Sequence, residues 1–83
     1  MENNSEEGLI LLNEVVRDVL GRRDINLELK MTALDVDGWD SLKHVQILYQ
    51  CEEKLNVRFT LQEIGSLNSI GDLVKIINKR LKK

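Results

Sequence analysis

The sequence lacks proline and has only one cysteine, one histidine and one each of tryptophan, tyrosine and phenylalanine. A single cysteine, Cys51, excludes an internal disulfide. The absence of proline, together with many Leu, Ile, Val, Lys and Glu residues, favours helices. No apolar run approaches the roughly 20 residues that a membrane span needs. We therefore expect a helical protein with neither a disulfide nor a membrane span.

The chain also lacks a strong charge of either sign, since its formal net charge is -2 at pH 7. Nucleic-acid binders usually gather basic residues on one face. The basic cluster here is Lys79, Arg80, Lys82 and Lys83, which suits the negative end of a helix better than a nucleic-acid arm. The N-terminal MENNSEEG is acidic and polar, unlike a secretory signal. We expect a cytoplasmic protein that binds no nucleic acid.

The length of 83 residues predicts one domain, residues 1–83, with a thin core. A chain of this size buries only about 60 to 65% of the surface that its unfolded form exposes. The polar ends, residues 1–6 and 82–83, are expected to be flexible.

Helical periodicity predicts a first and a last long helix. The first spans residues 7–21 and ends at Gly21, and the last follows a capping box formed by Ser69 and Asp72 and runs to Leu81. The apolar stripe of the first helix is Leu9, Leu12, Val15, Val16, Val19 and Leu20, and that of the last is Ile70, Leu73, Val74, Ile77 and Leu81.

A second capping box, Thr60 with Glu63, predicts a short helix within residues 60–67, which Gly65 limits to a turn or two. The 19-residue stretch 22–40 has no helical pattern. Its apolar residues alternate as in a strand, but no second strand pattern exists to pair with it. We predict an extended loop that lays these side chains across the helices, giving an all-α fold. The alternating residues are Ile25, Leu27, Leu29 and Met31.

A further helix is predicted from Ser41 to Leu55, with Asp40 as N-cap and Gly38 turning the chain before it. Its apolar residues form two stripes: a core stripe of His44, Ile47, Leu48, Cys51 and Leu55, and a second stripe of Leu42, Val45 and Tyr49. Two interpretations of the second stripe are open. Either Trp39 or the long loop covers it, or it is a docking surface beside Ser41.

The segment DVDGWDSLKHV, residues 35–45, supports neither a metal site nor catalysis. Trp39 and Asp40 stand where a calcium loop of the EF-hand type needs an acid and a glycine. Ser41 lacks the glycine-rich elbow of a serine hydrolase, and the lone His44 lies on the apolar stripe. Cys51 has no basic neighbour in the core and is expected to be a buried hydrophobe.

A point of attachment suits Ser41 better, because a helix N-terminus favours a phosphate esterified there. The segment GWDSL, Gly38 to Leu42, resembles the modification site of acyl carrier proteins. In that family a dedicated phosphopantetheinyl transferase esterifies the serine of D-S-L to phosphopantetheine drawn from coenzyme A. The thiol of this arm then carries an acyl group as a thioester. The resemblance extends from Leu9 to Leu81, and RFTLQEIGSLNSIGDLVKII is similar to the third and fourth helices of the family.

The resemblance implies a four-helix bundle that is a non-catalytic, monomeric carrier. It makes Ser41 the attachment point, flanked by Asp40 and Leu42. The residues that would dock on the transferase and on acyl-loading and acyl-transfer enzymes are Leu42, Lys43, Val45 and Tyr49. Those that would line an acyl cleft are His44, Ile47, Leu48, Cys51, Ile64, Leu67 and Val74.

The charge of the second helix departs from the fatty-acid carriers of this family, in which that helix is acidic. Residues 40–58 hold three acids and three bases, so steering by charge should be weaker. This favours a dedicated standalone carrier serving one biosynthetic pathway. Two alternatives stay open: an aminoacyl carrier of the D-alanyl or peptidyl type, and a helical interaction module without a prosthetic group.

Overall fold

The computed structural model describes residues 4–81 and contains four α-helices with one short 3-10 helix. The α-helices are α1 (Asn4–Leu20), α2 (Ser41–Leu55), α3 (Leu61–Gly65) and α4 (Ile70–Leu81), and the 3-10 helix is η1 (Ala33–Asp35). Within residues 4–81 there is no strand. The predicted all-α, four-helix architecture is confirmed.

The helix boundaries agree with the sequence patterns except at the start of α1. This helix begins at Asn4, three residues before the predicted start, and ends before Gly21, whose φ of 69° is a left-handed conformation that glycine adopts readily. The predicted flexible ends include residues 1–3 and 82–83, which lie outside the described residues.

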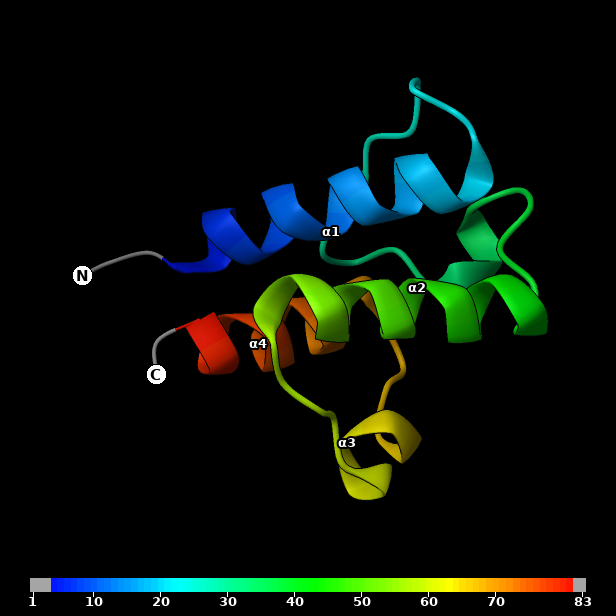
Figure 1. The fold of residues 1–83 in the computed structure, drawn as a ribbon. Helices are drawn as coiled ribbons and strands as arrows, with labels where there is room; N and C mark the ends of the chain where they lie inside the picture. Colours follow the sequence, from blue (N-terminus) through cyan, green and yellow to red (C-terminus); the bar gives the residue numbers. More distant parts are fainter. Residues whose placement is uncertain (1–3, 82–83) are drawn as a thin grey trace.

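Helices α1, α2 and α4 pack against one another, and α3 lies apart from them in Figure 1. Each long helix turns one apolar face inward, and these faces form a single core. The fully or almost fully buried side chains of the core are Leu12, Val15, Val16, Ile47, Cys51, Ile70, Leu73, Val74 and Ile77.

The long loop between α1 and α2 follows the predicted alternation for only half of its apolar residues. Ile25 and Leu27 are buried, but Met31 is only half-buried and Leu29 is exposed. The loop backbone is held to α1, where Asn13 Oδ1 accepts a hydrogen bond from the Leu27 amide at 2.8 Å. The prediction that all the alternating side chains lie across the helices is therefore wrong for Leu29.

Leu29 is exposed because the loop at this point pairs through its backbone with the first turn of α4. The carbonyl of Leu29 accepts a hydrogen bond from the Gly71 amide at 2.9 Å, and that of Met31 accepts one from the Ile70 amide at 2.7 Å. These amides belong to the first turn of α4, where no helical partner exists for them. A Cβ at position 71 would lie 3.0 Å from the Leu29 carbonyl oxygen, so a glycine permits this close approach.

The capping box predicted at the start of α4 forms only in part. Ser69 Oγ accepts a hydrogen bond from the Asp72 amide at 3.2 Å. The Asp72 carboxylate, however, accepts from the Asn68 amide at 2.9 Å instead of from that of Ser69. Together with the loop carbonyls, these contacts fix the N-terminus of α4.

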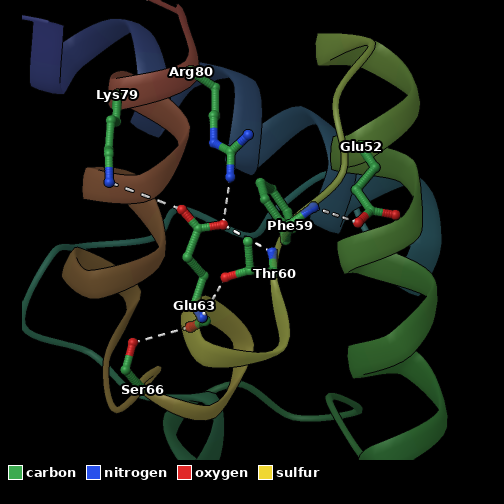
Figure 2. A network of polar contacts seen from close by, with 7 residues as sticks. All are labelled: Glu52, Phe59, Thr60, Glu63, Ser66, Lys79 and Arg80. Atoms are coloured by element: carbon green, nitrogen blue, oxygen red, sulfur yellow. Dashed lines mark hydrogen bonds and ion pairs between the residues drawn. The ribbon is translucent and has the colours of Figure 1, made fainter.

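Both hydrogen bonds of the capping box predicted for α3 are present. Thr60 Oγ1 accepts from the Glu63 amide at 3.0 Å, and Glu63 Oε1 accepts from the Thr60 amide at 2.9 Å. Figure 2 shows that the same carboxylate faces Arg80 and Lys79 on α4, while Glu52 on α2 accepts a hydrogen bond from the Phe59 amide at 2.8 Å. A polar network therefore ties α3 and the segment before it to both α2 and α4.

Candidate functional site at the start of helix α2

Ser41 is the first residue of α2, and its side chain is exposed. Gly38, at φ 92°, turns the loop toward the helix, and Asp40 caps it by accepting a hydrogen bond from the Lys43 amide at 2.9 Å. The predicted N-cap is confirmed. The Ser41 hydroxyl is therefore not needed for capping and is presented to solvent at the positive end of the helix dipole.

Trp39 and His44 form a hydrogen-bonded pair directly beside this serine. Trp39 is buried, and its Nε1 donates to His44 Nδ1 at 3.0 Å. Their ring centroids lie 6.0 Å apart. The half-buried His44 thus packs as the apolar stripe predicts, but its hydrogen bond to the only tryptophan is not evident from helical periodicity.

The second apolar stripe of α2 is exposed. Leu42, Val45 and Tyr49 keep 65%, 62% and 60% of their surface accessible, and we call these three residues the exposed stripe. The interpretation that Trp39 or the long loop covers them is wrong, because Trp39 turns inward to the core. Lys43, predicted to belong to the same docking surface, is half-buried.

The residues predicted to line an acyl cleft separate into two groups. Ile47, Cys51 and Val74 belong to the buried core. Leu48 also belongs to the core, at 7% exposed, and together with Ile64 it lines a groove of about 260 Å³ between α2 and α3. His44 lines this groove too and also a small cavity of about 70 Å³ that contains Leu67. The groove, rather than the core, is the surface that could admit a chain.

A larger groove, of about 560 Å³, shares His44 and Val45 with the first and includes Ser41 in its wall. We call it the serine groove. Its remaining lining comes from η1, from the two residues before α2 and from the start of α2. Its η1 wall is not predictable from helical periodicity, because Ala33 and Leu34 lie in a stretch of the sequence that has none. The lining residues are Ala33, Leu34, Trp39, Asp40, Ser41, His44 and Val45.

Cys51 is buried, as expected for a packed hydrophobe. Burial raises the pKa of its thiol to about 12. A thiol with so high a pKa is a poor nucleophile at neutral pH. Among residues 4–81, no group of three or more His, Cys, Asp or Glu side chains is arranged to hold a metal ion.

Known proteins with the same fold and a similar sequence decide the family. No protein-family model matches the chain. The acyl carrier protein of Acidothermus cellulolyticus is 31% identical over 77 residues, covering 93% of this chain and 92% of that protein. The acyl carrier protein of Rhodococcus erythropolis is 29% identical over 79 residues, covering 95% and 87%.

This chain belongs to the acyl carrier protein family. A solved structure agrees: the holo acyl carrier protein from Geobacter metallireducens has a TM-score of 0.83 and 32% identity, covering 90% of this chain and 86% of that one. The resemblance carried by GWDSL is therefore confirmed for the chain as a whole. Acyl carrier proteins are non-catalytic carriers.

Across residues 4–81 of this carrier protein, no helix combines the length and the apolar character that crossing a bilayer requires.

Proposed function

We propose that this protein is a standalone acyl carrier in which the Ser41 hydroxyl is esterified to phosphopantetheine. The exposure of Ser41 at the N-terminus of α2 is the observation that carries this proposal. Its neighbours Asp40 and Leu42 complete the D-S-L motif of the acyl carrier protein family. We propose a monomer that acts in the cytoplasm.

The residues around Ser41 fit a phosphopantetheine group. Asp40 caps α2 through the Lys43 amide, which leaves the Ser41 and Leu42 amides of the first turn near the point where a phosphate would be attached. The apolar wall of the serine groove, including Leu34 and Val45, suits the hydrocarbon part of the arm. When bound, the group supplies a thiol that holds the acyl cargo as a thioester.

The exposed stripe is the surface that we assign to partner enzymes. Leu42, Val45 and Tyr49 would contact the phosphopantetheinyl transferase, and afterwards the enzymes that load and transfer the acyl group. Apolar side chains gathered on an exposed helix face are typical of such surfaces. Lys43 lies beside them and would add a positive charge at the edge of the contact.

The groove between α2 and α3 is the part of the predicted acyl cleft that we retain for the cargo. His44, Leu48 and Ile64 line it, and Leu67 lies in the adjacent small cavity. Ile47, Cys51 and Val74 form the core behind this surface and would contact a cargo only if α3 moved.

The balanced charge of residues 40–58 supports a dedicated pathway over general fatty-acid synthesis. Three acids (Asp40, Glu52, Glu53) are matched by three bases (Lys43, Lys54, Arg58). Partners that recognise acidic carriers through basic patches would gain little attraction from this segment, because its charges balance. Complementary charge chiefly raises the association rate, so such partners would associate more slowly. Specificity would therefore depend more on the exposed stripe.

Intact-mass measurement tests the proposed attachment. The folded protein is treated with coenzyme A and a broad-specificity phosphopantetheinyl transferase, and we expect one added phosphopantetheine. The Ser41→Ala variant is the control and should stay unmodified while folded. An unchanged mass for the wild type would refute the proposed attachment and leave the interaction module as the remaining alternative.

The cargo requires a separate measurement on the modified protein. Mass spectrometry of the protein isolated from its own source would report the modification and the acyl group together. Incubation of the holo form with adenylating enzymes tests the aminoacyl alternative, since transfer of an amino acid to the arm would replace the acyl assignment.

A further inference from the structure

The serine groove brings apolar surface to the side of the Ser41 hydroxyl. Leu34, on η1, is 95% exposed although it is apolar, and Val45 across the groove is also exposed. Ser41 itself forms part of the groove wall. A group attached to this serine would therefore begin inside the groove, next to apolar side chains that nothing else in residues 4–81 covers.

The groove also contains one polar group whose hydrogen-bonding role can be assigned. An indole N–H can only donate, so the bond from Trp39 Nε1 requires that His44 Nδ1 accepts and carries no proton. The neutral imidazole must then carry its proton on Nε2. Among residues 4–81 no acceptor is found for this Nε2–H, and His44 lines the serine groove, the groove between α2 and α3 and the small cavity beside Leu67.

We propose that the serine groove is a binding site for the phosphopantetheine arm, with His44 Nε2–H donating a hydrogen bond to an amide carbonyl of the arm. Leu34 and Val45 contact the hydrocarbon of the arm on either side. Trp39 is the positioning residue, because it fixes the tautomer and orientation of His44. This inference rests on the proposed function, since it requires an arm on Ser41.

Val45 connects the arm site with the surface that we assign to partner enzymes. It lines the serine groove and also belongs to the exposed stripe. A partner enzyme that covers the stripe must therefore compete with the arm for Val45.

Isotope-filtered NMR of the holo protein tests the site directly. An isotope-labelled chain is modified with unlabelled coenzyme A, so that filtered cross peaks report only contacts between arm and protein. We expect cross peaks from the arm to the methyl groups of Leu34 and Val45 and to the His44 ring. Cross peaks confined to Leu48 and Ile64, or none at all, would overturn the proposal.

Two exposed leucines provide a matched pair of variants. Leu34→Ala removes a wall of the groove, whereas Leu61→Ala removes a side chain on α3 that is 88% exposed and lies outside the groove lining. Both variants should stay folded, because neither side chain is buried. Only Leu34→Ala should weaken the cross peaks from the arm to Val45 and His44, and equal spectra for the two variants would contradict the assigned site.

Trp39→Phe tests the positioning role, since it keeps an aromatic ring but removes the donor to His44. We expect the population of the docked arm to fall roughly twofold to tenfold, the scale of one hydrogen bond. In the wild-type apo protein, the nitrogen resonances of the His44 ring should show the Nε2–H tautomer. The opposite tautomer would refute the proposal without any modification of Ser41.

These measurements separate the inference from the proposed function. If the mass of the wild type does not change on treatment with coenzyme A and the transferase, the proposed function fails and the site fails with it. If the mass increases but the arm shows no contact with the serine groove, the carrier function stands and only the arm site is refuted.

Discussion

Arg80 Nη2 donates a hydrogen bond to Glu63 Oε1 at 2.5 Å and so joins the last turn of α4 to the first turn of α3 (Figure 2). The same oxygen accepts the hydrogen bond from the Thr60 amide, and Lys79 Nζ lies 4.0 Å from Glu63 Oε2. The guanidinium of Arg80 also lies over the Phe59 ring, 6.0 Å from its centroid. A helix of five residues is too short to be stable alone, so these contacts hold α3 in place as one wall of the groove between α2 and α3.

Replacing Glu63 by Gln keeps an oxygen that can accept from the Thr60 amide but removes the charge that faces Arg80 and Lys79, so it should destabilise the protein by about 1 kcal/mol at pH 7, the scale of a charged hydrogen bond made neutral. The hydrogen bond from the Thr60 amide is the largest cause that lowers the pKa of Glu63, with Arg80 adding to it. Because the folded pKa lies below the ordinary value of 4.5, the stabilisation is complete above that value and is lost as the pH falls through the lowered pKa.

Denaturant unfolding of the wild type and Glu63→Gln over a series of pH values measures this effect. The difference in unfolding free energy should shrink in acid, because protonation removes the charge that the variant lacks. Glu14→Gln, at an exposed position of α1, is the control and should show no comparable difference. A difference that grew as the pH fell would contradict the role assigned to Glu63.

Thiol labelling should distinguish Cys51 from a phosphopantetheine thiol. Cys51 is buried and its pKa is about 12, so iodoacetamide should not label the folded apo protein at neutral pH. The holo protein should take one label while folded, on the arm, and a second after unfolding. Mass spectrometry counts the labels, and rapid labelling of folded apo protein would show that Cys51 is accessible.

Asp40 and Ser41 should respond differently to replacement by alanine. Asp40→Ala removes the acceptor of the Lys43 amide and should cost about 1 kcal/mol of stability. Ser41→Ala should change stability by less than about 0.5 kcal/mol, because its side chain is exposed and does not cap the helix. Thermal and denaturant unfolding compare the two, and an unfolded Ser41→Ala variant would refute Asp40 as the cap.

The exposed stripe should matter for modification and not for stability. Leu42→Ala should leave the unfolding free energy within about 0.5 kcal/mol of the wild type. The rate of modification by the phosphopantetheinyl transferase should fall roughly fivefold, as expected for a contact residue worth about 1 kcal/mol. Leu61→Ala, at an exposed position outside the stripe, serves as the control, and similar rates for both variants would remove the stripe from the docking surface.

Ile47 and Val45 lie two residues apart on α2 and should differ sharply in their contribution to stability. Ile47 is fully buried, so Ile47→Ala should cost about 2 to 5 kcal/mol. That is a large share of the roughly 5 to 15 kcal/mol that stabilises a typical domain. Val45→Ala should cost little because Val45 is exposed. Similar denaturant midpoints for the two variants would place both residues on the same face.

The helices and the capping of α2 and α3 could be predicted because local rules decide them. Apolar spacing near 3.6 residues, Asp40 before α2 and the Thr60–Glu63 pair before α3 each act within one or two turns. The start of α1 was less predictable, since Asn4 and its neighbours continue the helix without apolar residues that would reveal it.

The long loop shows where local patterns are insufficient. Ile25, Leu27, Leu29 and Met31 have the same alternation, yet Leu29 faces solvent because the loop backbone turns to pair with the first amides of α4. Those amides belong to residues about 40 positions further along the chain, and a local pattern holds no information about a partner so distant.

By itself, the sequence determined the all-α fold and the placing of Ser41 at the start of a helix, because helix periodicity and capping are properties of neighbouring residues. The tertiary structure alone decided which apolar side chains are buried and which are exposed: Trp39 turns into the core, and Leu42, Val45 and Tyr49 remain exposed. It also brought η1 beside α2 to form the serine groove and paired Trp39 with His44. These features depend on how distant segments pack, and packing is settled only when the whole core forms.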